Sequence, residues 1–66
     1  MFSVRLKSVR KSKKLTQDAL ARLVGTKKAT ISNYETGYST PSIYVLIDLA
    51  KALHVSTDYM LGLIDK

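Results

Sequence analysis

The chain has 66 residues, a formal net charge of +6 and no cysteine. This length fits one small domain, which buries only about 60% of its unfolded surface and so needs efficient helix packing, a partner subunit or both. Without cysteine it has no disulfide and no thiolate metal ligand, and no window approaches the roughly 20 apolar residues of a membrane span, so we expect no metal site, no membrane contact and a cytoplasmic location.

The positive charge is concentrated near the N-terminus. Six basic residues and no acidic residue fall within the first fourteen positions, namely Arg5, Lys7, Arg10, Lys11, Lys13 and Lys14. Such a surface is typical of proteins that bind polyanions, but a solvated, soluble surface accounts for the charge equally well. Charge alone therefore does not decide between the two interpretations.

Helical periodicity predicts five helices and no strand of useful length. The first runs from about Ser3 to Lys13, with Leu6 and Val9 facing the interior. The second follows Thr16 as its N-cap and ends at Gly25. We expect a compact helical bundle with short connections.

The remaining helices have similar boundary signals. The third is predicted to follow Thr26 as its N-cap and to stop before Gly37. The fourth follows Ser42 and the short fifth opens at Ser56. The core positions predicted in the fourth helix are Ile43, Leu46, Leu49, Ala50 and Leu53.

Two helix ends are unusual because they lack the glycine that commonly terminates a helix. Lys14 and His54 stand at these positions. If either residue adopts a left-handed conformation, this costs on the order of 1 kcal/mol. Both are basic residues near a helix C-terminus, where a positive charge offsets part of the cost.

The segment Thr16–Gly37, TQDALARLVGTKKATISNYETG, has the pattern of a helix-turn-helix. The apolar positions that two crossed helices would share are Leu20, Val24, Ile31 and Tyr34. Ala21 is small where the helices approach most closely, and Gly25 permits a positive φ in the turn. This order and spacing predict a second helix that is free to enter a DNA groove.

With these residues the chain resembles the Cro/cI-type helix-turn-helix family of phage repressors, also called the xenobiotic-response-element (XRE) type. The similarity covers LTQDALARLVG, ATISNYETG, TPSIYVLIDLAKAL and VSTDYML, and therefore nearly the whole chain. It implies an all-α, five-helix domain over residues 1–66, with the helix-turn-helix at about 16–37. The departures are Lys14 and His54 in place of the usual glycines, and a short GYSTPS loop.

The resemblance implies that four residues face base edges, namely Lys27, Lys28, Ala29 and Asn33. Their chemistry suits this role, because lysine donates to guanine, asparagine pairs with adenine, and an alanine methyl touches a thymine methyl. A phosphate contact by Lys27 is an alternative, and an ordinary polar helix surface is an alternative for all four.

The resemblance also implies contacts with DNA phosphates. The residues assigned to them are Arg10, Gln17, Thr26, Thr30, Ser32, Thr36, Tyr38, Ser39, Thr40 and Ser42. Arg10 is further expected to pair with Glu35, which would fix the angle of the recognition helix. Gly25, Glu35 and Gly37 are expected to be structural. The alternative for Arg10 and Glu35 is that they are two exposed charges that never meet. The alternative for Tyr38 is an aromatic side chain at the surface without a role in binding.

A dimer is implied as well, through a patch formed by Tyr44, Val55, Tyr59 and Met60. Simple core packing is the alternative, above all for Met60 and Leu61. Two recognition helices about 34 Å apart would read a palindrome with half-sites one turn apart. A protein antagonist or an additional C-terminal domain is left open as a further partner.

We expect a sequence-specific double-stranded DNA-binding repressor of phage or mobile-element type, located in the cytoplasm with the nucleoid. An antitoxin or a restriction-modification controller on the same domain is one alternative. A protein-interaction module that uses the helix-turn-helix only as a scaffold is another. No residue set suits catalysis, and we expect no cofactor and no enzymatic activity.

Overall fold

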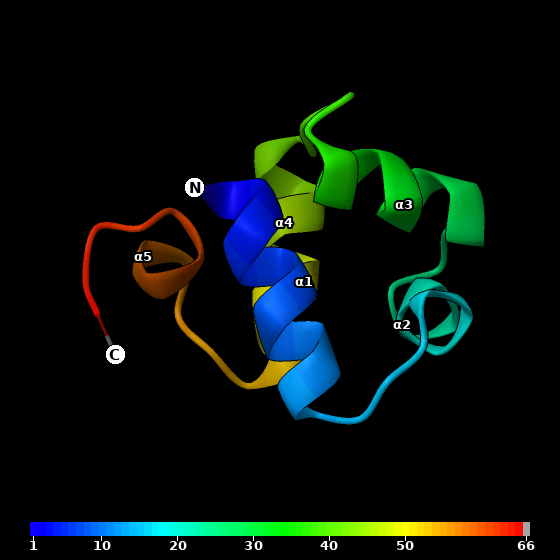
Figure 1. Cartoon of the computed structure of the whole chain (residues 1–66), viewed down its shortest axis with the longest axis horizontal. Coiled ribbons are helices and arrows are strands. Elements are labelled where there is room, and N and C mark those ends of the chain that lie inside the picture. The colour runs from blue at the N-terminus through cyan, green and yellow to red at the C-terminus, as the bar shows by residue number, and fades with distance from the viewer. Residues whose placement is uncertain (66) are drawn as a thin grey trace.

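The computed structural model describes residues 1–65, and these form five α-helices and no strand. The helices are α1 (Phe2–Ser12), α2 (Gln17–Leu23), α3 (Lys28–Thr36), α4 (Ile43–Leu53) and α5 (Thr57–Met60). In Figure 1, α1 and α4 occupy the centre, α2 and α3 lie on one side, and α5 lies on the other. The all-α prediction is confirmed. Lys66, the last residue of the predicted domain, lies outside the described residues.

A single apolar core joins the five helices. Each helix contributes at least one side chain with no exposed surface: Leu6, Leu20, Ile31, Leu49 and Met60. The helical spacing predicted most of this core, because residues three and four apart share one face of a helix. The prediction that Ile43 belongs to the core is wrong, because this residue is 60% exposed in the first turn of α4. No helix within residues 1–65 is long and apolar enough to cross a bilayer.

Three helices begin as the sequence predicts. The hydroxyl groups of Thr16, Ser42 and Ser56 each accept a hydrogen bond from the backbone N–H three residues on, at 3.0, 3.3 and 3.0 Å. These bonds satisfy backbone donors that have no partner inside the helix. The first helix begins and ends one residue earlier than the predicted Ser3–Lys13.

The prediction that Thr26 caps α3 is wrong. Gly25 has a φ of +72°, and the N–H of Thr26 donates to the carbonyl of Ala21 at 2.8 Å. This bond closes the C-terminal end of α2, so Thr26 belongs to the turn. The N-cap of α3 is Lys27, whose side chain makes no capping hydrogen bond.

The two helix ends without glycine both adopt the left-handed conformation that the sequence left open. Lys14 has a φ of +59° and His54 a φ of +58°. In both turns the next residue donates to a carbonyl five residues back, from Leu15 to Arg10 at 3.2 Å and from Val55 to Ala50 at 3.0 Å. The same hydrogen-bond pattern therefore ends α1, α2 and α4.

Candidate nucleic-acid interface

The outer face of α3 is polar and exposed because its apolar residues fix the rotation of the helix. Ile31 is fully buried and Tyr34 is 9% exposed. The four residues predicted to face bases are all exposed: Lys27, Lys28, Ala29 and Asn33. Ala29 and Asn33 lie on the side of α3 opposite Ile31, and Lys27 and Lys28 stand at its N-terminal end. Packing of α3 against α1 and α2 holds this face in one orientation.

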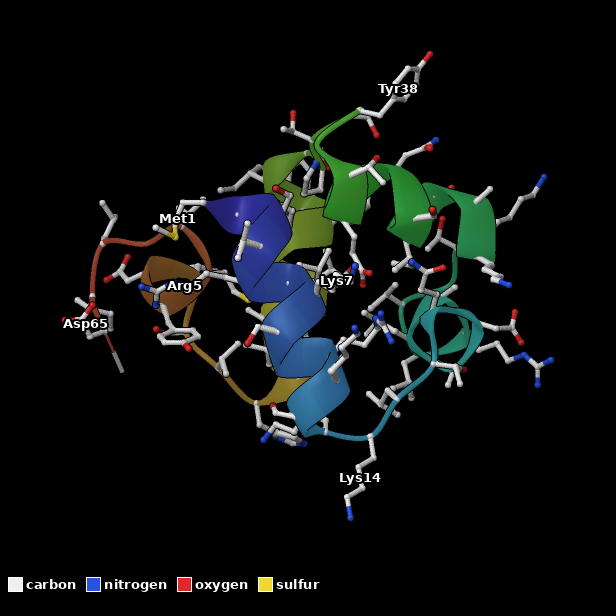
Figure 2. The ribbon with its side chains drawn as sticks, in the orientation of Figure 1. Met1, Arg5, Lys7, Lys14, Tyr38 and Asp65 are labelled. Atoms are coloured by element: carbon white, nitrogen blue, oxygen red, sulfur yellow. The ribbon has the colours of Figure 1, made fainter. Side chains whose placement is uncertain are left out.

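The loop after α3 leaves the helix at Gly37, which has a φ of +81°. The backbone N–H of Ser39 donates to the carbonyl of Asn33 at 3.3 Å, and the Thr36 hydroxyl donates to the same carbonyl at 3.2 Å. The loop therefore folds back on the end of α3. Tyr38 is 83% exposed and points away from the body of the protein (Figure 2).

A buried ion pair connects α1 to the last turn of α3. Arg10 Nε donates to Glu35 Oε2 at 2.6 Å, and Arg10 Nη2 donates to Glu35 Oε1 at 3.0 Å. Gln17 Nε2 donates to the same Oε1 at 3.1 Å, and Arg10 Nη1 donates to the Leu15 carbonyl at 2.7 Å. The Arg10–Glu35 pairing predicted from the sequence is confirmed, and it brings together three helices.

This environment controls the charge of Glu35. Burial raises the pKa of its carboxyl group. Hydrogen bonds from Arg10 and Gln17, together with the charges of Arg10 and Lys7, lower the pKa by more than burial raises it, so the pKa lies below its ordinary value. The hydrogen bond to Glu35 likewise raises the pKa of Arg10. Both groups are therefore charged at neutral pH.

The expected phosphate contact of Arg10 disagrees with its surroundings. Its side chain is only 9% exposed, and all three guanidinium nitrogens already donate within the protein. Nη1 and Nη2 each keep one further N–H, but the side chain is largely covered, so we assign Arg10 chiefly to positioning of α3. Gln17 keeps one amide N–H beyond its bond to Glu35.

The other residues predicted to contact phosphate surround α3. Exposed members are Thr36, Tyr38, Thr40 and Ser42, and half-buried members are Gln17, Thr26, Thr30, Ser32 and Ser39. The Ser42 oxygen already accepts the N–H of Val45. Its hydroxyl proton is still available as a donor.

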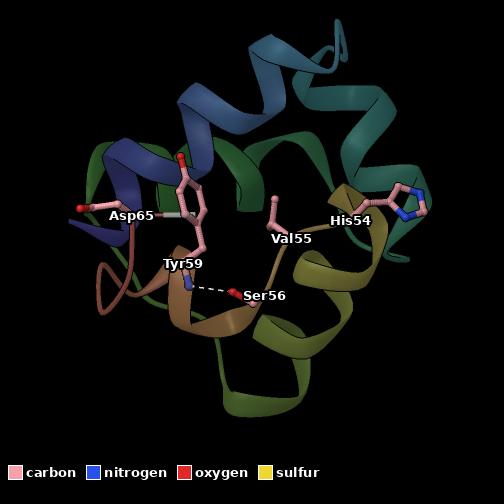
Figure 3. Close-up of a pocket in the computed structure, with 5 residues that line it drawn as sticks. All are labelled: His54, Val55, Ser56, Tyr59 and Asp65. Carbon is pink, nitrogen blue, oxygen red and sulfur yellow. Dashed lines mark hydrogen bonds between the residues drawn. The ribbon is translucent and has the colours of Figure 1, made fainter.

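The predicted dimer patch is only partly at the surface. Met60 has no exposed surface, so its placement in the patch is wrong: its side chain completes the core against α1 and α4. Tyr44 is 77% exposed. Val55 and Tyr59 line an open hollow of about 440 Å³ beside α5 (Figure 3).

Sequence reasoning missed the role of Arg5. Its guanidinium lies 4.3 Å from the centre of the Tyr59 ring, donates to the Ile64 carbonyl at 3.0 Å, and lies 3.7 Å from the Asp65 carboxylate. These contacts hold the segment after α5 against α1 (Figure 2). The only signal in the sequence was the presence of Arg5 in the first basic cluster, which does not specify a partner.

Comparison with known proteins gives a consistent match. A family model described as "Helix-turn-helix" matches residues 6–60. The chain is 40% identical over 65 residues to YobD of Bacillus subtilis, which is named an uncharacterized HTH-type transcriptional regulator. The matched region covers 98% of this chain and 58% of that protein. The chain spans little more than half the length of the first curated relatives it matches.

Solved structures with the same arrangement include DNA complexes. The P22 c2 repressor bound to a synthetic operator has a TM-score of 0.88 and 35% identity, over 91% of each chain. The restriction-modification controller C.AhdI from Aeromonas hydrophila has a TM-score of 0.85 and 30% identity, over 89% of each chain.

Proposed function

The chain belongs to the helix-turn-helix family, and on that premise we propose that it is a sequence-specific, double-stranded DNA-binding transcriptional regulator. More narrowly, we propose a dimeric repressor of phage or mobile-element type that reads a palindromic operator. The observation that carries the proposal is the exposed polar face of α3, held in place by the buried Arg10–Glu35 pair.

The proposed mechanism separates base recognition from phosphate binding. Lys28, Ala29 and Asn33 project from the exposed face of α3 toward base edges in the major groove. Gln17 and the loop around Tyr38 contact the backbone on either side and set the position of α3 on the duplex. Lys27 contributes charge at the start of α3, where it reaches either a base or a phosphate.

Dimer formation is proposed through α4 and the hollow beside α5. Ile43 and Tyr44 are 60% and 77% exposed, which is a large apolar area for the first turn of a helix. Val55 and Tyr59 offer a recess beyond the other end of α4. A second copy related by a two-fold axis would cover this surface and place two α3 helices on one face of a duplex.

The role proposed is binding rather than catalysis, and it places the protein in the cytoplasm, with the DNA. A restriction-modification controller is a second candidate, favoured by the structural similarity to C.AhdI. An antitoxin would use the same DNA-binding surface. The genes beside this one distinguish these regulators from a phage-type repressor, because the biochemistry of binding is the same in each.

The test is selection of binding sites from random duplex DNA at near-physiological salt, followed by sedimentation of the protein with and without the selected duplex. A palindrome with half-sites about 34 Å apart, bound by two copies, is expected. A single half-site bound by one copy would overturn the dimer. No enrichment, with retention lost as salt rises, would overturn site-specific binding and favour a protein-interaction module.

A further inference from the structure

Lys7 lies on the edge of α1 that runs along the C-terminal half of α3. Ser3, Lys7 and Arg10 are spaced i, i+4 and i+7, so they share one face of α1. The Ser3 hydroxyl is 3.9 Å from the position that a Cβ on Gly37 would take, and Arg10 bonds to Glu35. Lys7 is therefore placed between these two contacts, and Figure 2 shows it on the side of α1 that carries α3.

The groups around Lys7 are already paired with one another. Both oxygens of Glu35 accept hydrogen bonds from Arg10, and Gln17 donates to one of them. The Lys7 charge is the smallest of the causes that lower the pKa of Glu35. Among residues 1–65, however, no hydrogen bond or ion pair holds the Lys7 side chain, and it is exposed. Arg10 and Glu35 cancel in charge, whereas Lys7 adds a positive charge to this surface.

We propose that the Lys7 ammonium contacts a DNA phosphate beside the C-terminal end of α3, next to the position that the family resemblance assigns to Arg10. The inference rests on the proposed DNA-binding function. A phosphate is the ligand because α1 packs behind α3 and does not itself enter a groove. A lysine at such a position acts as a mobile point charge, which suits a phosphate and carries no base information.

The test is the salt dependence of affinity for the selected duplex, measured for the wild type, Lys7→Gln, Lys7→Arg and Lys51→Gln. Lys51 is a matched control, because it is an exposed lysine in the last turn of α4. Lys51 lines a recess with Leu23 and Val24, which lie at the C-terminal end of α2, whereas Gln17 lies at its N-terminal end. Circular dichroism confirms that each variant is folded before binding is measured.

Loss of one phosphate contact makes the slope of log K against log salt less steep by about 0.9. Between about 50 and 200 mM salt, the wild type should therefore lose about 3.5-fold more affinity than Lys7→Gln does. Lys7→Arg should keep the wild-type slope, and Lys51→Gln should match the wild type. Lys7→Gln should also weaken selected and scrambled duplexes by the same factor.

The alternative outcomes separate the two proposals. If the wild type binds its selected site and Lys7→Gln keeps the wild-type slope, the Lys7 contact is overturned while the regulator remains. If Lys7→Gln changes affinity for one base pair only, Lys7 reads sequence and the phosphate assignment is wrong. If the wild type enriches no site and shows no salt-dependent binding to duplex DNA, both proposals are overturned.

Discussion

Replacement of Arg10 by Met removes the charge that stabilises Glu35 while keeping an unbranched apolar side chain in its place. The Glu35 side chain is 2% exposed, and in the variant only Gln17 would still donate to it. Breaking a buried ion pair in this way costs about 3–5 kcal/mol. A domain of 66 residues has a total stability of roughly 3–10 kcal/mol, so the variant should be close to unfolding at neutral pH.

The pH dependence identifies the cause of this loss. In the wild type the pKa of Glu35 is lowered, so its contribution to stability is present above the unfolded pKa and is lost as pH falls through the folded pKa. In Arg10→Met, burial acts without the arginine and raises the pKa of Glu35, so its penalty is present at neutral pH and disappears on protonation. The difference in unfolding free energy between the two proteins should therefore shrink as pH falls.

Urea unfolding at a series of pH values, followed by circular dichroism, measures this difference. Arg22→Met is the control, because Arg22 pairs with Asp18 at 3.0 Å in an exposed i, i+4 pair and should cost less than about 0.5 kcal/mol. The double variant Arg10→Met/Glu35→Gln should recover part of the stability at neutral pH. A loss for Arg10→Met that matches the control, or that does not change with pH, would refute the argument.

Three further changes test separate parts of the molecule. Asn33→Ala should lose about 1–3 kcal/mol of binding free energy at one operator base pair, measured by competition binding with single-base variants of the operator. An equal loss of affinity for random DNA would contradict a base contact. Tyr44→Asp should abolish dimers in sedimentation, whereas Leu23→Asp, on an exposed part of α2, should not; equal behaviour of the two would remove Tyr44 from the interface. His54→Gly should raise unfolding free energy by up to about 1 kcal/mol by relieving the left-handed φ of +58°, and a decrease would show that the histidine side chain matters more.

The elements that follow local rules could be predicted from the sequence. The core helices and three side-chain caps depend on spacing and on residue type within a few positions, and the structure confirms them. The prediction that Thr26 caps α3 failed because threonine has the chemistry of an N-cap, yet the backbone N–H of Thr26 already closes the end of α2. Two local rules competed for one residue, and the hydrogen bond within the Gly25 turn decided the outcome.

Met60 misled for a different reason, because burial depends on elements distant in sequence. A four-residue helix has no periodicity long enough to separate an inner face from an outer one. Tyr59 and Met60 are neighbours in α5, but only Met60 is fully buried, while Tyr59 packs at the edge of the core beneath Arg5. The segment after α5 therefore depends on a contact between residues about sixty positions apart, for which no local pattern exists.

The basic residues of α1 show most directly what a pattern of charge leaves undetermined. By sequence, Lys7 and Arg10 are two cations on one helical face, and either suits a phosphate. Their burial differs. Each guanidinium nitrogen of Arg10 donates to Glu35 or to the Leu15 carbonyl and the side chain is buried, whereas Lys7 is exposed. Replacement of Arg10 should therefore change chiefly the free energy of unfolding, and replacement of Lys7 chiefly the salt dependence of DNA binding. Each replacement removes one positive charge, so a difference between them cannot come from net charge.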